Sequence, residues 1–338
     1  MSATEHAARQ RPLQRYGPRP LPTPSDGPDP YGNPDPEWLR INWRDHLHTI
    51  NVPPASSASP PGAAGSAEGT RVHYAEMGPP EPEQHPLAIV FVHGLGGCWQ
   101  NWLENMPHFA QRHRVLALDL PGFGSSPVPD WEISISAYGR LVLDFCDVVG
   151  VRDCVVVGNS MGGFVAAEAT IAQPDRFEKL VLVSAAGVSS ARLRREPTAV
   201  AARGFAVGAP LIFQAQTHSF ARRRARRLAF RMIFDDPGAL RPELVWEFWD
   251  GGKRAESFVE ALSSLAGYDF LDRLSEIEVP TLIVWGAQDH VVPPADALGY
   301  ANRIAGAQLE VFERCGHVPM AERPVRFNRV LERFLDPA

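Results

Sequence analysis

Residues 155–163 read Val-Val-Val-Gly-Asn-Ser-Met-Gly-Gly, so that a serine stands between an apolar, strand-like run and a helix-forming stretch. Glycines lie two residues before and two residues after Ser160. Only residues this small let a strand and a helix approach closely enough for a sharp turn, and such a turn holds its serine in a strained conformation. The pattern predicts a nucleophile elbow, Gly-x-Ser-x-Gly, with Ser160 at its tip.

A serine nucleophile needs two partners further along the chain. Its hydroxyl is weak at neutral pH, so a histidine must accept the proton and a carboxylate must orient that histidine. His317 and Asp289 each follow an apolar run, 309–312 and 282–285, at the strand end where an open α/β sheet presents functional groups. The order Ser160, Asp289, His317 is the one expected for such a sheet. We expect Ser160 to be the nucleophile, His317 the base and then the acid, and Asp289 the orienting carboxylate.

Other polar residues near the strand ends are expected to be structural. An acid after the run 180–184 would be the main alternative to Asp289, but Ala-Ala-Gly-Val follows that run and offers no carboxylate. Asp119 precedes the elbow and is expected to fix its own loop. His93 is expected to shape the loop after the run 87–92 and not to act in catalysis.

Acyl transfer passes through an oxyanion, which needs two hydrogen-bond donors already directed at it. The elbow supplies the backbone N–H of Met161. The Gly-rich stretch His93-Gly94-Leu95-Gly96-Gly97 follows an early strand, and we expect the N–H of Leu95 to be the second donor.

No cofactor or metal is expected. Neither Gly-x-x-x-x-Gly-Lys-Ser/Thr nor Gly-x-Gly-x-x-Gly follows a strand, so the glycines do not predict a nucleotide site. The four cysteines form no Cys-x-x-Cys pair and have no zinc-like spacing with histidine. The sequence therefore predicts neither a metal site nor a disulfide framework, and it fits a reducing compartment.

The apolar runs predict an α/β fold. Several are continuous in Val, Ile and Leu and do not alternate with polar residues, which is typical of strands buried on both faces of a mainly parallel sheet. The stretches 135–149 and 162–172 are expected to be crossover helices. The expected strands are 72–75, 87–92, 115–118, 154–157, 180–184, 282–285 and 309–312.

Composition divides the 338 residues into four segments. Residues 1–68 hold 13 of the 32 prolines and are expected to form an arm and linker, with a short docking helix at 38–50. Residues 69–188 and 269–338 are expected to be two parts of one α/β core. Between them the strand rhythm stops, and residues 189–268 are expected to be an inserted helical lid.

Charge and hydropathy limit the expected partners and location. The net charge of −6 argues against nucleic acid as a partner of the whole chain. No run of 18 apolar residues predicts stable membrane insertion, and the N-terminus lacks the apolar region of a secretory signal, so a cytoplasmic protein is expected. Residues 189–268 nevertheless carry a net charge of +5, which leaves −11 for the rest.

The basic segment leaves two sets of alternatives open. In 220–232, six apolar residues are predicted to share one helical face, with arginines on most of the remainder: Phe220, Ala221, Ala225, Leu228, Ala229 and Met232. The arginines are either solvated or attract an anionic substrate or a membrane surface. The lid's aromatic residues, among them Phe205, Phe213, Phe234, Trp246, Phe248, Trp249 and Phe258, form either its core or an apolar acyl pocket above Ser160.

Five motifs together resemble the α/β-hydrolase superfamily, and they occur in the family's order: His93-Gly94-Leu95-Gly96, the stretch 119–126, the elbow, the segment around Asp289, and Gly316-His317. The resemblance covers residues 69–338. It implies an eight-stranded, mostly parallel sheet flanked by helices, with a lid between the sixth strand and the helix before the seventh.

The resemblance leaves the reaction open among three classes. A serine elbow separates the chain from haloalkane dehalogenases and epoxide hydrolases, which carry aspartate there. The elbow and the ending 312–317 are similar to carbon–carbon bond hydrolases of aromatic ring-cleavage products, but the loop 94–97 lacks their Gly-Pro-Gly-like sequence and Val318 replaces their tryptophan. We expect cleavage of a carboxylic ester with an apolar acyl group. The alternatives are carbon–carbon cleavage of a vinylogous diketone and ligand binding without catalysis. The sequence does not determine the oligomeric state.

Overall fold

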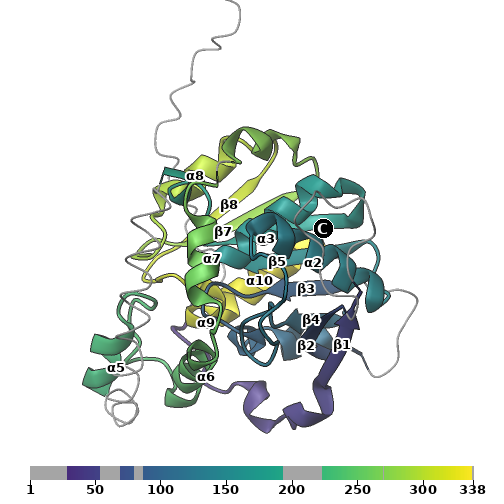
Figure 1. Ribbon diagram of the computed structural model, residues 1–338. Helices are drawn as coiled ribbons and strands as arrows, with labels where there is room; N and C mark the ends of the chain where they lie inside the picture. The colour runs from purple at the N-terminus through teal and green to yellow at the C-terminus, as the bar shows by residue number, and fades with distance from the viewer. Residues whose placement is uncertain (1–28, 54–68, 80–86, 193–222, 269, 337–338) are drawn as a thin grey trace, which may run out of the picture.

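The computed structural model describes residues 29–53, 69–79, 87–192, 223–268 and 270–336. Within these residues, eight strands form one sheet in the order β1-β2-β4-β3-β5-β6-β7-β8 (Figure 1). Strand β2 pairs antiparallel with β1 and β4, and the other neighbours pair parallel, so the predicted mostly parallel sheet is confirmed. The strands are β1 (Leu47–Val52), β2 (Thr70–Met77), β3 (Ile89–Val92), β4 (Val115–Leu118), β5 (Cys154–Asn159), β6 (Phe177–Val183), β7 (Thr281–Gly286) and β8 (Gln308–Phe312).

Helices flank the sheet (Figure 1). The predicted crossover helices are present as α2 and α3, which pack against each other. In the described part of the chain, no helix is both long enough and apolar enough to span a bilayer. The α-helices are α1 (Met106–Ala110), α2 (Ile135–Val148), α3 (Met161–Ala172), α5 (Arg223–Phe230), α6 (Pro242–Lys253), α7 (Phe258–Leu265), α8 (Ala295–Ala301), α9 (Pro319–Glu322) and α10 (Pro324–Leu335).

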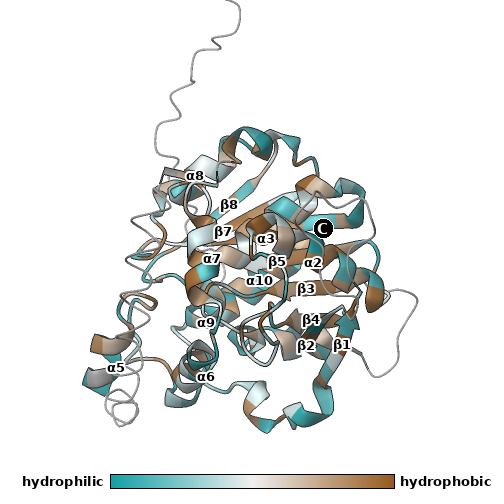
Figure 2. Ribbon diagram, viewed as in Figure 1, coloured by the Kyte–Doolittle hydropathy of each residue, from teal (hydrophilic) through white to brown (hydrophobic). Residues whose placement is uncertain are grey.

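Each continuous apolar strand serves two cores. In β3, Val90 and Val92 belong to one buried cluster, with side chains of α2 and α3, whereas Ile89 and Phe91 belong to another, with side chains of α1 and α10. Successive side chains of a strand point to opposite faces of the sheet, so a strand covered on both sides is apolar throughout. Figure 2 shows the same pattern, with hydrophobic central strands and more hydrophilic outer helices.

The predicted docking helix at 38–50 is wrong. Two short 3-10 helices, Glu37–Arg40 and Trp43–His46, lead directly into the edge strand β1. The β-branched Thr49, Ile50 and Val52 favour a strand, and β2 supplies its hydrogen-bonding partner. The sheet therefore begins before the predicted start at residue 69. The expected arm 1–28 and most of the linker, 54–68, lie outside the described residues.

The segment 189–268, called the inserted segment below, is helical where it is described. It joins β6 to β7 and contains α5, α6 and α7. The predicted apolar face is not buried where it is described, because Leu228 is 85% exposed and Met232 is 61% exposed. Arg226 is buried instead, since its guanidinium donates to the carbonyl oxygens of Pro237 and Gly238. Residues 193–222, with Phe205, Phe213, Phe220 and Ala221, lie outside the described part.

Candidate active site

Ser160 lies in a strained turn between β5 and α3. Its φ of 56° and ψ of −118° are sparsely populated by residues with a side chain. The flanking glycines are required by close packing: a Cβ at Gly158 would collide with the carbonyl oxygen of Gly162, and a Cβ at Gly162 would collide with that of Val92. The backbones of strand β5, helix α3 and the end of β3 are therefore in direct contact around the serine.

This close contact gives a stability prediction. Because the carbonyl of Val92 belongs to the sheet and cannot move aside, Gly162→Ala is expected to lower the free energy of unfolding by about 3 kcal/mol. Chemical denaturation measures the change. The matched control is Gly252→Ala in α6, where the nearest atom to a new Cβ is 3.7 Å away; it is expected to raise stability by about 0.5 kcal/mol. Equal stability of the two variants would contradict the packing described for the elbow.

His317 and Asp289 form a buried pair on the loops after β8 and β7. The Nδ1 atom of His317 lies 2.8 Å from Oδ2 of Asp289. The other carboxylate oxygen accepts hydrogen bonds from the N–H groups of Val291 and Val292, at 2.8 and 2.9 Å. The aspartate is thus held rigidly, and its bond to Nδ1 leaves Nε2 as the imidazole nitrogen for another partner.

Asn159 connects the histidine loop to the elbow. Its Nδ2 atom donates to the carbonyl oxygens of Val183, at 3.1 Å, and His317, at 3.2 Å. Gln288 joins the loop of Asp289 to the loop of His317. Its side-chain oxygen accepts from the N–H of Cys315, and its own N–H donates to the carbonyl of Cys315. We did not identify either residue from the sequence, although each directly precedes a residue that we did predict.

The Gly-rich loop after β3 lies against the elbow. A Cβ at Gly94 would be 3.0 Å from the Cβ of Ser160. The N–H of Gly97 donates to the carbonyl of Gly94 at 3.0 Å, and Gly96 has a φ of +70°, as a type II turn requires at its third residue. This turn does not use the N–H of Leu95. Met161 begins α3, and the first N–H groups of a helix have no acceptor within the helix.

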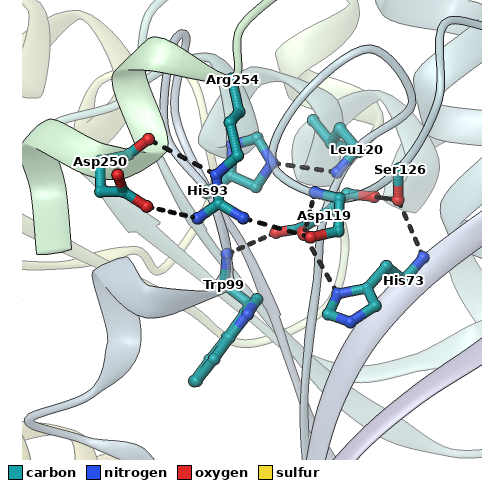
Figure 3. A network of polar contacts seen from close by, with 9 residues as sticks. His73, His93, Trp99, Asp119, Leu120, Ser126, Asp250 and Arg254 are labelled. Atoms are coloured by element: carbon teal, nitrogen blue, oxygen red, sulfur yellow. Dashed lines mark hydrogen bonds and ion pairs between the residues drawn. The ribbon is translucent and has the colours of Figure 1, made fainter.

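Asp119 fixes its own loop, as predicted (Figure 3). One carboxylate oxygen accepts from the N–H of Trp99 at 2.7 Å, and the other accepts from the N–H of Ser125 at 2.8 Å. The second oxygen also lies 3.3 Å from Nδ1 of His73. Asp119 therefore binds three separate segments near the Gly-rich turn.

His93 has the predicted structural role. Its Nε2 atom accepts from the N–H of Leu120 at 2.9 Å (Figure 3), and its Nδ1 lies 2.7 Å from the carbonyl oxygen of Gly94. Burial lowers the pKa of His93, although nearby Asp119 acts in the opposite direction. The ring is therefore neutral with its proton on Nδ1, and both nitrogens are engaged by backbone groups.

The inserted segment packs on the loop that Asp119 fixes. Arg254 donates to the hydroxyl of Ser125 at 3.2 Å and pairs with Asp250 at 3.2 Å (Figure 3). The N–H of Ser257 donates to the carbonyl of Gly122 at 3.1 Å. The turn between α6 and α7 is thereby anchored close to the candidate site.

The described aromatic residues of the inserted segment have different surroundings, and Trp246 is 36% exposed. Phe230, Phe234 and Trp249 are buried and make edge-to-face contacts with one another, so they belong to the core. Phe258 differs, because its ring would be 3.4 Å from a Cβ at Gly96. It places an apolar surface over the Gly-rich turn.

All four site segments follow the carboxyl ends of parallel strands. The Gly-rich turn follows β3, Ser160 follows β5, Asp289 follows β7 and His317 follows β8. In a parallel sheet these ends share one edge, where open α/β sheets bind ligands. The structure thus brings the predicted site segments together through the contacts of Gly94, Asn159 and Asp289 described above.

Comparison with known proteins identifies the fold family. The family model of the α/β hydrolase fold matches residues 88–324. The chain is 31% identical to a 2-hydroxy-6-oxononadienedioate/2-hydroxy-6-oxononatrienedioate hydrolase of Burkholderia vietnamiensis, over 78% of this chain and 91% of that protein. It is 30% identical to the dihydrolipoyllysine-residue acetyltransferase component of the acetoin cleaving system of Cupriavidus necator, over 79% of this chain and 67% of that protein. The solved structure of a bacterial membrane phospholipase A is similar with a TM-score of 0.64 and 25% identity, over 86% of this chain and 85% of that one. The chain therefore belongs to the α/β hydrolase fold family.

Proposed function

We propose that the chain is a serine hydrolase that cleaves a carboxylic ester through an acyl-enzyme, with Ser160 as the nucleophile. The observation that carries the proposal is the strained backbone of Ser160 beside the Gly-rich turn, with the His317–Asp289 pair tied to the same elbow through Asn159. Nucleophilic catalysis requires a serine and an oriented histidine that can accept its proton, and these contacts hold the two segments that carry them together.

In acylation, His317 acts first as a base and then as an acid. The Oγ atom of Ser160 attacks the carbonyl carbon of the ester while Nε2 of His317 accepts the hydroxyl proton. Asp289 keeps the other imidazole proton on Nδ1 and stabilises the imidazolium that forms. The backbone N–H groups of Leu95 and Met161 donate to the oxyanion. Collapse of the intermediate breaks the carbon–oxygen ester bond, and the alcohol leaves with the proton from His317.

Deacylation repeats these steps with water. The water oxygen attacks the acyl carbon while His317 accepts a proton from the water. The N–H groups of Leu95 and Met161 donate to the second oxyanion as they do to the first. Collapse releases the carboxylic acid, and His317 returns its proton to Ser160. No cofactor or metal takes part in this scheme.

The substrate is proposed to be a small molecule with an apolar acyl group. Phe258 lies over the Gly-rich turn and offers an apolar surface beside the oxyanion donors. The net charge of +5 on the inserted segment favours an additional anionic group on the substrate.

Carbon–carbon bond cleavage is the second candidate. It is supported by the Burkholderia relative, which is named as a hydrolase of 2-hydroxy-6-oxononadienedioate and 2-hydroxy-6-oxononatrienedioate. The same serine, histidine and oxyanion donors would serve this reaction. Val318 and the loop 94–97 are the positions at which the chain departs from the pattern of such enzymes.

Comparing the two substrate classes tests the proposal. We expect kcat/KM for 4-nitrophenyl butyrate to exceed that for a 2-hydroxy-6-oxo-dienoate by about 100-fold or more, because the site is proposed to bind an ordinary acyl group. Both substrates can be followed by absorbance, with Ser160→Ala as the blank. A preference of similar size for the dienoate would identify a carbon–carbon hydrolase. Turnover of neither, with tight binding of one, would favour ligand binding without catalysis.

A further inference from the structure

The backbone on both sides of His317 is held by partners outside its own loop. The N–H of Gly316 donates to Oε1 of Glu322 at 2.9 Å, and the N–H of Val318 approaches the same oxygen at 3.4 Å. The N–H of His317 itself donates to the carbonyl oxygen of Ile233 at 2.7 Å. The position of the histidine therefore depends on the Glu322 carboxylate and on the inserted segment.

The second oxygen of Glu322 reaches the inserted segment and a distant tyrosine. Oε2 accepts from the N–H of Asp235 at 2.8 Å and from the hydroxyl of Tyr31 at 2.6 Å. The Tyr31 oxygen in turn accepts from the N–H of Asp236 at 2.8 Å. Burial raises the pKa of Tyr31, so the hydroxyl keeps the proton that it donates. Glu322 is itself completely buried, which makes each of these bonds hard to replace with water.

Tyr31 belongs to an N-terminal strap, defined here as residues 29–36. The N–H of Gly32 donates to the carbonyl of Glu322 at 2.7 Å, and Arg323 donates to the carbonyl of Asp29 at 2.9 Å. The guanidinium of Arg323 also lies over the Tyr31 ring, 5.1 Å from its centre. The strap lies outside residues 88–324, the region that the family model matches.

We propose that the strap contributes to the active site. Tyr31 of the strap and Glu322 are positioning residues that keep His317 aligned with Ser160. Glu322 connects three segments distant in sequence: the strap, the inserted segment and the histidine loop. The proposal rests on the proposed function, because it assumes that His317 is the catalytic base. Neither Tyr31 nor Glu322 is assigned contact with the substrate.

The charge state of Glu322 makes the proposal testable by pH. Desolvation raises its pKa to about 7, while its hydrogen bonds to Tyr31 and to the backbone N–H groups oppose the rise. If the carboxyl were protonated, one of its oxygens would carry the proton, and Glu322 could no longer accept every hydrogen bond that it accepts now. Activity should therefore require ionised Glu322 and fall as pH falls through about 7. The ionisable residues around it are Tyr31 of the strap, Asp235, whose N–H it binds, His317, whose flanking N–H groups it binds, Cys315, and the adjacent Arg323.

Tyr31→Phe is the most direct variant. It removes the bond that favours ionised Glu322, so we expect the acid limb of the kcat–pH profile to move to higher pH. At neutral pH we expect kcat for 4-nitrophenyl butyrate to fall about tenfold with KM changed less than about twofold, because alignment and not binding is lost. Active-site titration with a fluorophosphonate corrects for inactive protein. The matched control is Tyr74→Phe, a buried tyrosine of β2 outside the proposed site, which should keep the wild-type profile.

Glu322→Gln provides a second test. The amide cannot ionise, so we expect kcat to fall about 100-fold and the Glu322 contribution to the acid limb to disappear. Glu168→Gln, which alters a buried glutamate paired with Arg273, controls for general loss of stability. A Tyr31→Phe enzyme with a uniformly lower kcat and an unmoved acid limb would make Tyr31 merely structural and overturn the proposal, as would wild-type kinetics. Failure of the wild-type protein to react with the fluorophosphonate would instead refute the proposed function itself.

Discussion

Ser160→Ala is expected to lower kcat/KM for an aryl ester by about 100,000-fold, because it removes the only atom proposed to attack the acyl carbon. The backbone at residue 160 carries the strain with either side chain, so folding should be little changed. Initial rates with 4-nitrophenyl butyrate, measured on protein whose thermal unfolding matches the wild type, give the effect.

A matched serine variant separates chemistry from packing. Ser264 is also buried, and its hydroxyl donates to the backbone carbonyl of Ala261 within α7. Ser264→Ala should keep kcat/KM within about threefold of the wild type, since it loses only a local hydrogen bond. Comparable activity of Ser160→Ala and Ser264→Ala would exclude Ser160 as the nucleophile.

Asp289→Asn is expected to lower kcat by about 10,000-fold through the tautomer of His317. An asparagine amide facing Nδ1 would donate to it, which would place the imidazole proton on Nε2. The base could then no longer accept the proton of Ser160. The two backbone N–H groups that bind the other Asp289 oxygen can be kept by the asparagine carbonyl, so the loop should remain in place.

The control for this variant is Asp296→Asn. Asp296 is equally buried and accepts the N–H of Ser189 at 2.8 Å, but it belongs to α8 and has no role in the proposed mechanism. Replacing the Asp296 carboxylate should change the free energy of unfolding of the protein more than its kcat. If Asp289→Asn retained a tenth or more of the wild-type kcat while Asp296→Asn did the same, another carboxylate would have to orient His317.

The sequence predicted those parts of the fold in which local pattern and burial agree. Seven strands were evident as short apolar runs, and those buried on both faces of the parallel part of the sheet, such as β3 and β4, are apolar throughout. Strand β1 was missed because it is an edge strand with only Val52 buried, so its apolar residues fit a helix equally well. In α5, Arg226 is buried and Leu228 is exposed, which reverses the pattern expected from polarity alone.

The candidate site was predictable to a similar extent. Ser160, Asp289 and His317 each follow a recognisable strand, so their common edge of the sheet could be inferred before the structure was known. The supporting contacts could not be, because they join residues remote in sequence. Tyr31 and Glu322 are 291 positions apart, and only the folded chain brings the strap to the histidine loop.

Covalent labelling tests the central claim, that Ser160 is an activated nucleophile, most directly. Native protein would be treated with a fluorophosphonate, digested and mapped by mass spectrometry. We predict one modified peptide carrying the label on Ser160, no reaction of Ser160→Ala, and strongly slowed reaction of Asp289→Asn. Labelling of Ser160→Ala at the wild-type rate, or no labelling of the folded wild-type protein, would contradict the account.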